Sequence, residues 1–156
     1  MKNRPTIYFA APLFNDRERA FNTKVAHELE RYAEVFLPQR DGELLSELIQ
    51  NGMTASLAER RIFRADALAM RNSDLLVAIL DGAHIDEAVA FEIGFACGLN
   101  CCCVGLQTDT RRALPSGNNP MIGQSLHRIF PELEALYDWV TCWSAEWFAT
   151  NLRSTA

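Results

Sequence analysis

The strongest constraint on the fold is a run of six consecutive apolar residues, Leu-Leu-Val-Ala-Ile-Leu, at positions 75–80. A strand that faces water on one side alternates apolar and polar residues, whereas this run has no polar position. Strands of this kind occur in parallel sheets whose two faces are both covered by helices. Asp81 and Gly82 follow directly and mark the carboxyl end of the strand. We therefore expect residues 75–80 to form a strand buried on both faces.

Shorter apolar runs alternate with segments of helical periodicity along the rest of the chain. We expect further strands at residues 6–11, 34–37, 101–106 and 139–143. Helices are expected at about 16–32, 44–49, 54–70, 86–99, 125–137 and 145–152, with polar loops at 39–42 and 108–124. Strands that alternate with helices pair in parallel, because each connection crosses one face of the sheet. The sequence thus predicts one α/β domain over residues 1–156, a flavodoxin-like, doubly wound five-stranded parallel sheet with helices on both faces.

Charge and cysteine content argue against several classes of protein. The net charge is −5 and no basic stripe is present, so binding to nucleic acid has little electrostatic support. No apolar run approaches the ~20 residues that a membrane-spanning helix needs. The five cysteines, three of them consecutive at 101–103, fit neither a zinc site nor a disulfide framework. We expect reduced cysteines, a cytoplasmic location, and no contact with nucleic acid or membrane.

Glu92 is the only charged residue in the segment 88–99, which reads Ala-Val-Ala-Phe-Glu-Ile-Gly-Phe-Ala-Cys-Gly-Leu. A helix that is apolar on nearly all sides is normally buried, so this carboxylate is expected in or beside a dry region. Burying an unpaired carboxylate costs several kcal/mol or raises its pKa. Glu92 is therefore expected either to form a structural ion pair with an Arg or Lys or to carry out chemistry. Gly94 and Gly98 are expected to pack closely against the sheet.

Other carboxylates lie near Glu92 in the sequence. Asp81, Asp86 and Glu87 precede it, and Asp66 lies on the preceding predicted helix. Carboxylates in different environments suit cleavage at the anomeric carbon of a sugar, where one attacks the carbon or stabilises its charge and another protonates the leaving group. In retaining chemistry the two carboxyl groups lie about 5 Å apart.

Tyr8, in the first predicted strand, is a candidate to donate the hydrogen bond that keeps such a glutamate ionised. Magnesium binding is the competing use of clustered acids, and it would favour a glycine-rich loop that cradles phosphate. The chain has no Gly-x-x-x-x-Gly-Lys motif, and no Gly-x-Gly-x-x-Gly follows the first strand. We therefore expect neither a metal nor an organic cofactor.

Motifs across much of the chain match one known pattern. The opening strand reads Ile-Tyr-Phe-Ala-Ala-Pro-Leu-Phe at positions 7–14. Asp86 and Glu92 are six residues apart, a glycine follows two residues later, and Asp66 precedes Glu92 by twenty-six residues. Asn119 and Met121 form an Asn-x-Met motif. In these features the chain resembles the nucleoside 2-deoxyribosyltransferase family.

This resemblance implies a reaction and a role for each acid. Glu92 would attack C1′ of a 2′-deoxyribonucleoside and displace the base, and a second base would then take the sugar with retained configuration. Tyr8 would orient Glu92, and Asp66 would help to move the proton that the base needs. Slow hydrolysis would occur when no acceptor base is present. The implied activity is that of a pentosyltransferase of nucleotide salvage, with a deoxyribonucleoside and a free nucleobase as substrates.

The resemblance also implies substrate contacts and an assembly. Asp86, together with Asn119 from a neighbouring subunit, would hold the 5′-hydroxyl of the sugar, and Met121 would wall the pocket. Gln39 and Asp41, in the loop after the second strand, would read the edge of the base. The chain is therefore expected to form a homo-oligomer built from dimers, up to a hexamer, in which Asn119 and Met121 complete a neighbouring site.

Each of these residues also has an ordinary structural explanation. Asp86 has the position of a helix N-cap, and the two roles can coexist. Asp66 could be solvated or paired with a nearby arginine, and Tyr8 could simply pack in the core. Asn119 and Met121 could belong to an ordinary loop.

Besides a nucleoside hydrolase that uses water as the acceptor, two other functions are compatible with the same motifs. A 2′-deoxynucleoside 5′-monophosphate N-glycosidase would need a phosphate pocket, typically rich in hydroxyl groups. The segment 81–86 has no Ser or Thr, and its acids would repel a phosphate, which favours a free nucleoside. A non-catalytic nucleotide-sensing module is the other alternative, and it should still bind its ligand after Glu92→Ala.

Overall fold

The computed structural model describes residues 2–111 and 117–153, with side chains up to residue 151. At its centre is a five-stranded parallel sheet with the order β2-β1-β3-β4-β5. The strands are β1 (Thr6–Ala10), β2 (Glu34–Phe36), β3 (Leu75–Ile79), β4 (Cys102–Leu106) and β5 (Arg128–Phe130). The strand order reverses beside β1, which makes the sheet doubly wound. The predicted α/β class and the five-stranded parallel sheet are therefore confirmed.

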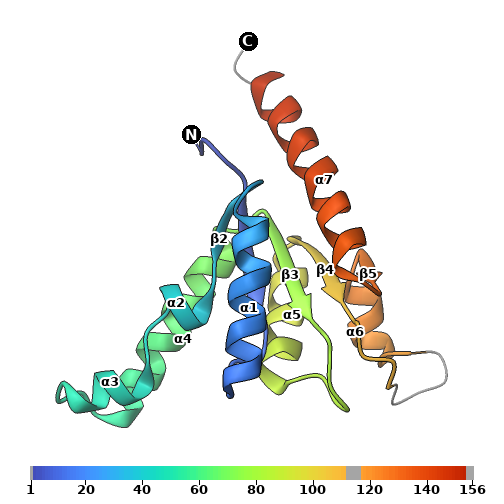
Figure 1. Ribbon diagram of the computed structural model, residues 1–156. Helices are drawn as coiled ribbons and strands as arrows, with labels where there is room; N and C mark the ends of the chain where they lie inside the picture. Colours follow the sequence, from blue (N-terminus) through green and yellow to red (C-terminus); the bar gives the residue numbers. More distant parts are fainter. Residues whose placement is uncertain (1, 112–116, 154–156) are drawn as a thin grey trace.

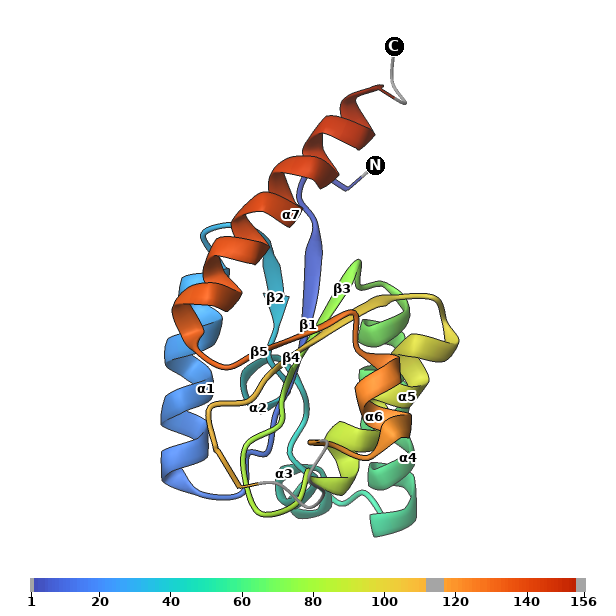
Figure 2. The same ribbon diagram turned by 90° about the vertical axis from the view of Figure 1, so that its right-hand side faces the viewer.

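Helices cover both faces of this sheet. Figure 2 shows α1 and α7 on one side of the strands and α4, α5 and α6 on the other. Figure 1 shows α2 and α3 in the connection between β2 and α4. The helices are α1 (Asp16–Leu29), α2 (Pro38–Asp41), α3 (Leu45–Gln50), α4 (Ala55–Arg71), α5 (Glu87–Gly98), α6 (Pro120–Ser125) and α7 (Leu133–Arg153).

The central strand β3 is buried along its whole length, as its apolar run predicts. Its residues alternate between two hydrophobic clusters, one on each face of the sheet. Leu75 and Val77 join the cluster beneath α1 and α7, whereas Leu76 and Ala78 join the cluster beneath α4 and α5. Because all the strands are parallel, the loops after them lie along one edge, where ligands bind in sheets of this type.

The fifth strand is not where the sequence pattern places it. Residues 139–143 are helical and belong to α7, whereas β5 lies inside the segment 125–137 that was expected to be a helix. Trp139 and Trp143 favour strands by propensity, but their rings stack 6.5 Å apart, as side chains four residues apart on a helix can. Leu136 and Val140 are fully buried at the same spacing. Burial of this helical face against the sheet outweighs the strand preference of the tryptophans.

Both expected loops contain short helices. The segment 39–42 overlaps α2, in which Pro38 occupies the first turn. The segment 108–124 contains most of α6, which begins at Pro120 and is capped by the Asn119 side chain. Proline favours the first turn of a helix because its φ angle is already helical and no amide hydrogen is needed there. The sequence pattern indicates the end of a strand at Pro38 and a polar loop around Pro120, whereas both prolines begin helices.

Helix α5 is buried on one face only, contrary to the expectation from its composition. Val89, Ile93 and Ala96 face the sheet and are almost completely buried. Gly94 and Gly98 are exposed, and a Cβ atom built at either position would meet no neighbouring atom within 4 Å. The expected packing of these glycines against the sheet is therefore wrong, and the outer apolar face of α5 is open in this chain.

The described part of the chain contains no helix with the length and hydropathy required to cross a bilayer. All five cysteines are free thiols. Within residues 2–111 and 117–153, the His, Cys, Asp and Glu side chains form no group of three or more that could hold a metal ion.

Candidate active site

Tyr8 and Glu92 meet on the face of the sheet that α5 covers. Tyr8 Oη donates a hydrogen bond to Glu92 Oε1, with a distance of 2.6 Å between the two oxygens. Tyr8 lies in the middle of β1 and is fully buried, while Glu92 comes from the second turn of α5. Burial and the neighbouring charge of Glu92 raise the pKa of Tyr8 well above its ordinary range. The tyrosine therefore remains a proton donor to the carboxylate at any physiological pH.

Glu92 is half-buried, and its pKa is raised to about 7. Burial is the main cause, because it disfavours the charged form; the hydrogen bond from Tyr8 acts in the opposite direction, and the charges of Asp66 and Asp86 raise the pKa further. No ion pair among the described residues involves Glu92. The alternative of a structural ion pair is thus not what the structure shows.

Asp66 contributes the second carboxyl group of the site. It lies on α4, is half-buried, and has a pKa raised to about 6 by burial. Its charge raises the pKa of both Tyr8 and Glu92, so it lies near enough to act on them. The ion pairs of the described residues include no partner for Asp66; Arg61, on the same helix, binds Glu43 instead. The site therefore holds two acids of raised pKa with no cation to neutralise them.

Asp86 occupies the N-terminus of α5. Its Oδ1 accepts hydrogen bonds from the backbone N–H groups of Ala88 at 2.9 Å and Val89 at 3.2 Å. Its Oδ2 has no hydrogen-bond partner among the described residues, so it remains able to accept one from a ligand. The structural explanation of Asp86 as a helix cap is confirmed, and its charge also reaches Glu92.

Asp81 belongs to the scaffold of the site. Its carboxylate accepts hydrogen bonds from the backbone N–H and the hydroxyl of Thr108, both at 2.6 Å, and from the N–H of Asp109 at 2.8 Å. Asp109 in turn accepts from Gly82 N–H at 3.3 Å. These bonds join the end of β3 to the end of β4, and they fix the start of the loop that leads to Asp86.

Gln39 is held by α1. Its Oε1 accepts from Asn22 Nδ2 at 3.0 Å, and its Nε2 donates to the carbonyl of Arg19 and the hydroxyl of Thr23. Both ends of the amide therefore have protein partners. Reading a base edge with Gln39 would require these hydrogen bonds to break.

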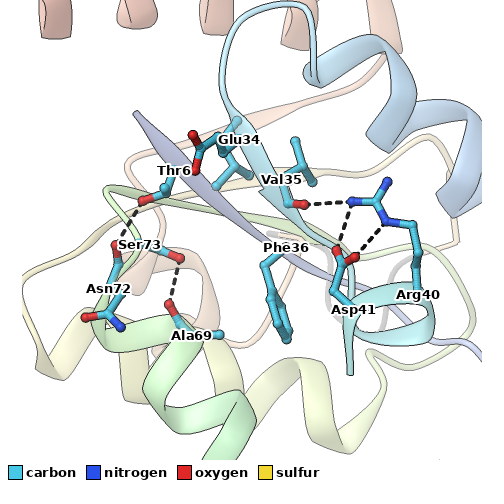
Figure 3. A pocket seen from close by; sticks show the side chains of 10 residues that line it. Thr6, Glu34, Val35, Phe36, Arg40, Asp41, Ala69, Asn72 and Ser73 are labelled. Atoms are coloured by element: carbon cyan, nitrogen blue, oxygen red, sulfur yellow. Dashed lines mark hydrogen bonds and ion pairs between the residues drawn. The ribbon is translucent and has the colours of Figure 1, made fainter. Parts of the chain in front are cut away.

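Asp41 is also held by its own surroundings. Its carboxylate accepts a hydrogen bond from Leu37 N–H. It also accepts hydrogen bonds from the Arg40 guanidinium (Figure 3). Burial acts to raise the pKa of Asp41, but these hydrogen bonds outweigh it and hold the pKa below its ordinary value. The structure thus brings Tyr8, Asp66, Asp86 and Glu92 together, whereas Asp41 serves the local structure of α2.

Asn119 and Met121 lie on another part of the same edge of the sheet. The Asn119 side chain accepts from Met121 N–H at 2.9 Å and caps α6. The Met121 side chain is 78% exposed and has no core to pack against. Neither residue forms a hydrogen bond with Glu92 within the described chain. Asn119 lines, together with Gly82 and Ile85, a cavity of about 250 Å³ beside the loop that leads to Asp86.

Sequence reasoning missed Phe36. Its ring stacks on the ring of Tyr8, with centroids 5.5 Å apart and planes inclined by 15°. Phe36 and Tyr8 are also register partners in neighbouring strands. The strand order could have revealed this contact, but the sequence does not state which strand lies beside β1.

The fold and the site together define a class: an α/β protein with a tyrosine-bound carboxylate beside the carboxyl edge of its sheet. Residues 7–138 match the family model described as nucleoside 2-deoxyribosyltransferase. The match covers most of the chain, which therefore belongs to the nucleoside 2-deoxyribosyltransferase family. No curated protein sequence matches the chain.

Solved structures share the fold. A conserved protein from Enterococcus faecalis is 27% identical, with a TM-score of 0.72 over 88% of this chain and 97% of that one. A 2-deoxyribosyltransferase from Bacillus psychrosaccharolyticus is 22% identical, with a TM-score of 0.69 over 85% and 90%. A CMP N-glycosidase from Clostridium botulinum is 15% identical, with a TM-score of 0.54 over 86% and 97%. At these identities the last two show the fold alone.

Proposed function

We propose that this protein transfers 2-deoxyribose between nucleobases through a covalent deoxyribosyl–Glu92 intermediate. The observation that carries the proposal is the 2.6 Å hydrogen bond from Tyr8 to a half-buried carboxylate that has no cation partner. This bond occupies Oε1 of Glu92, whereas Oε2 has no hydrogen-bond partner among the described residues. Oε2 is therefore the oxygen that attacks the sugar.

The reaction is a double displacement at C1′. A bond forms between Glu92 Oε2 and C1′ while the C1′–N bond breaks, and the base leaves with the electron pair. Asp66 supplies the proton that the departing base takes up. A second base then attacks C1′, releases Glu92 and returns a proton to Asp66. Two inversions leave the configuration at C1′ unchanged, and water as the acceptor gives slow hydrolysis.

The raised pKa values of the two acids suit these roles. A general acid works best when its pKa lies near the operating pH, and burial brings Asp66 to about 6. Glu92 must be ionised to attack, and Tyr8 is the neighbour that favours its ionised form. A 2′-deoxy sugar suits this chemistry, because the absence of the electron-withdrawing 2′-hydroxyl eases positive charge at C1′.

We propose further that Asp86 holds the 5′-hydroxyl through its free Oδ2. This assignment also favours a free nucleoside over a 5′-monophosphate. A helix N-terminus attracts phosphate when its N–H groups are available, but at α5 the Asp86 carboxylate already accepts those of Ala88 and Val89. A phosphate at the N-terminus of α5 would be repelled by the Asp86 carboxylate and would find the N–H groups of Ala88 and Val89 already occupied.

The active form is proposed to be a homo-oligomer built from dimers in the cytoplasm, with Asn119 and Met121 completing a neighbouring site. An aromatic patch supports self-association: the Phe63 and Phe91 rings lie 6.1 Å apart across α4 and α5 and are each at least half exposed. Exposed apolar patches of this kind mark surfaces that other proteins cover. Met121 is exposed in the same way, as expected for a residue that fills another subunit's pocket.

Incubation with deoxyinosine and adenine tests the proposed activity. We expect deoxyadenosine and hypoxanthine to form in equal amounts, and Glu92→Ala to abolish both. Release of hypoxanthine without deoxyadenosine would instead support an N-glycosidase. Binding of nucleosides that survives Glu92→Ala, with no turnover in the folded wild-type protein, would support a sensing module.

A further inference from the structure

The Tyr8 ring stacks on the ring of Phe36, which lies on the edge strand β2. The two rings are almost parallel, with ring centroids 5.5 Å apart. Tyr8 is the residue whose hydroxyl reaches Glu92 Oε1. Because the hydroxyl lies in the plane of the ring, a contact that fixes the ring plane also fixes the direction of the hydrogen bond.

Phe36 itself is fixed by a clamp at the free edge of β2. This strand has three residues and lies at the edge of the sheet, so among the described residues only β1 pairs with it. Arg40 Nη2 donates to the carbonyl of Val35, and Asp41 Oδ2 accepts from Leu37 N–H, both at 2.8 Å. Figure 3 shows the Arg40–Asp41 pair beside the strand at the level of Phe36. The two bonds lie on either side of Phe36 in the sequence and take the place of a sheet neighbour.

The Phe36 side chain packs against the cluster beneath α4 and α5. It is half-buried and lines a cavity of about 320 Å³ between β2 and α4. In Figure 3 its ring projects into the space between Asp41 and Ala69. The ring therefore stacks on Tyr8 and also borders a cavity, so the core does not enclose it on all sides.

We propose that Phe36 is a positioning residue that holds the Tyr8 hydroxyl on Glu92, with the Arg40–Asp41 clamp holding Phe36 in turn. The kinetic consequence rests on the proposed function, whereas the effect on the carboxyl group does not. The groups that act on Glu92 are Tyr8 from β1, Asp66 from α4 and Asp86 from α5. Of these, only Tyr8 favours the ionised carboxylate, so a loosened Tyr8 makes Glu92 harder to ionise.

The test measures the titration of Glu92 without turnover. Carbodiimide reacts with protonated carboxyl groups, so the labelling rate of the Glu92 peptide against pH, read by mass spectrometry, gives its pKa. We expect Phe36→Leu to move this curve upward by about 0.5 to 1 pH unit, the effect of weakening one hydrogen bond. Phe36→Tyr keeps a stacking ring and should retain the wild-type curve. Asp41→Ala should move the curve in the same direction as Phe36→Leu but by less.

A double-mutant cycle separates positioning from general loosening. Tyr8→Phe should shift the curve by itself, and adding Phe36→Leu to it should cause no further shift. Phe130→Leu is the matched control, because Phe130 lies in the equally short edge strand β5 and packs in the cluster on the opposite face; it should retain the wild-type curve. An unchanged curve in Phe36→Leu, or an equal shift with and without the Tyr8 hydroxyl, would overturn the inference. If Phe36→Leu shifts the curve but the wild-type protein does not exchange bases, the inference stands and the proposed function is refuted.

Discussion

The Tyr8 hydroxyl lies 2.6 Å from Oε1 of Glu92 although 84 residues separate them in the chain. The contact exists because β1 is an inner strand of the sheet and α5 covers the face toward which the Tyr8 side chain points. A hydrogen bond to a charged group in a partly dry site is stronger than one between neutral groups. Tyr8→Phe should therefore lower kcat/KM for base exchange by roughly 10- to 100-fold and move its acidic limb upward by about one pH unit. Tyr137→Phe, on the opposite face of the sheet, should change neither.

Asp66 should determine the alkaline limb of the same profile. Glu92 is ionised above about pH 7 and Asp66 is protonated below about pH 6, so only a minority of molecules hold both required forms. The two acids interact, so the profile reports the pair, and kcat/KM should peak between these values. Asp66→Asn should remove the alkaline limb and reduce exchange by roughly 100-fold. Asp138→Asn, on α7, should leave the bell-shaped profile of the wild type, and an intact alkaline limb in Asp66→Asn would refute the assignment.

Ionisation of Glu92 should lower the free energy of unfolding of the protein. Its pKa is raised from 4.5 to about 7 in the folded state, so the folded chain binds this proton more tightly than the unfolded chain does. The resulting stabilisation is fully present below 4.5 and is lost as pH rises through about 7. Glu92→Gln should therefore raise the free energy of unfolding at about pH 8 by roughly 1–3 kcal/mol and flatten its pH dependence. Urea titrations across this range measure the effect, and a variant less stable than wild type at about pH 8 would contradict it.

Asp81 should act on stability through the loop that it anchors. Asp81→Ala removes the acceptor of Thr108 and Asp109 at the junction of β3 and β4. We expect a loss of roughly 1–3 kcal/mol in the free energy of unfolding, because the amide donors at this junction lose their partner. Glu87→Ala removes an exposed acid close by and should change stability by less than about 0.5 kcal/mol. Equal effects of the two substitutions would argue against a scaffold role for Asp81.

The proposed assembly predicts that sites are shared between chains. Phe91→Glu places a charge in the aromatic patch and should give monomers in size-exclusion chromatography, together with loss of exchange. Phe148→Glu, at another exposed aromatic residue on α7, should leave the assembly unchanged. Glu92→Gln and Asn119→Ala should each be inactive alone, and mixing the two after subunit exchange should restore activity. If the mixed oligomers recover no activity, Asn119 and Glu92 of different chains do not form one active site, which would contradict the proposed assembly.

The sequence predicted those elements whose structure follows from the burial of their own apolar residues. The run at 75–80 is a buried strand because every residue in it is apolar, and the alternation of strands and helices predicted the parallel sheet. The position of β5 was missed because it offers only two consecutive apolar residues, Ile129 and Phe130, before Pro131. The equally short β2 continues into Leu37, and its longer apolar run was visible in the sequence. The tryptophans of α7 misled the prediction, since their strand propensity is outweighed by the helical spacing of Leu136 and Val140.

The contacts of the candidate site could be predicted from the sequence only in part. Glu92 stands out because a lone charge in an apolar helix is visible in the sequence itself. Phe36 could not be found in this way, because its role depends on β2 lying beside β1. Gln39 was placed by resemblance alone, and the structure engages its amide with α1. A sequence shows which residues are unusual, but contacts between strands require the sheet order.

Mass spectrometry of the enzyme, quenched with acid while it turns over a deoxynucleoside without an acceptor base, tests the central claim most directly. Our account predicts a deoxyribosyl adduct on the peptide that contains Glu92, absent from Glu92→Gln and removed when a nucleobase is added before the quench. An adduct on a different side chain of an enzyme that exchanges bases would contradict it.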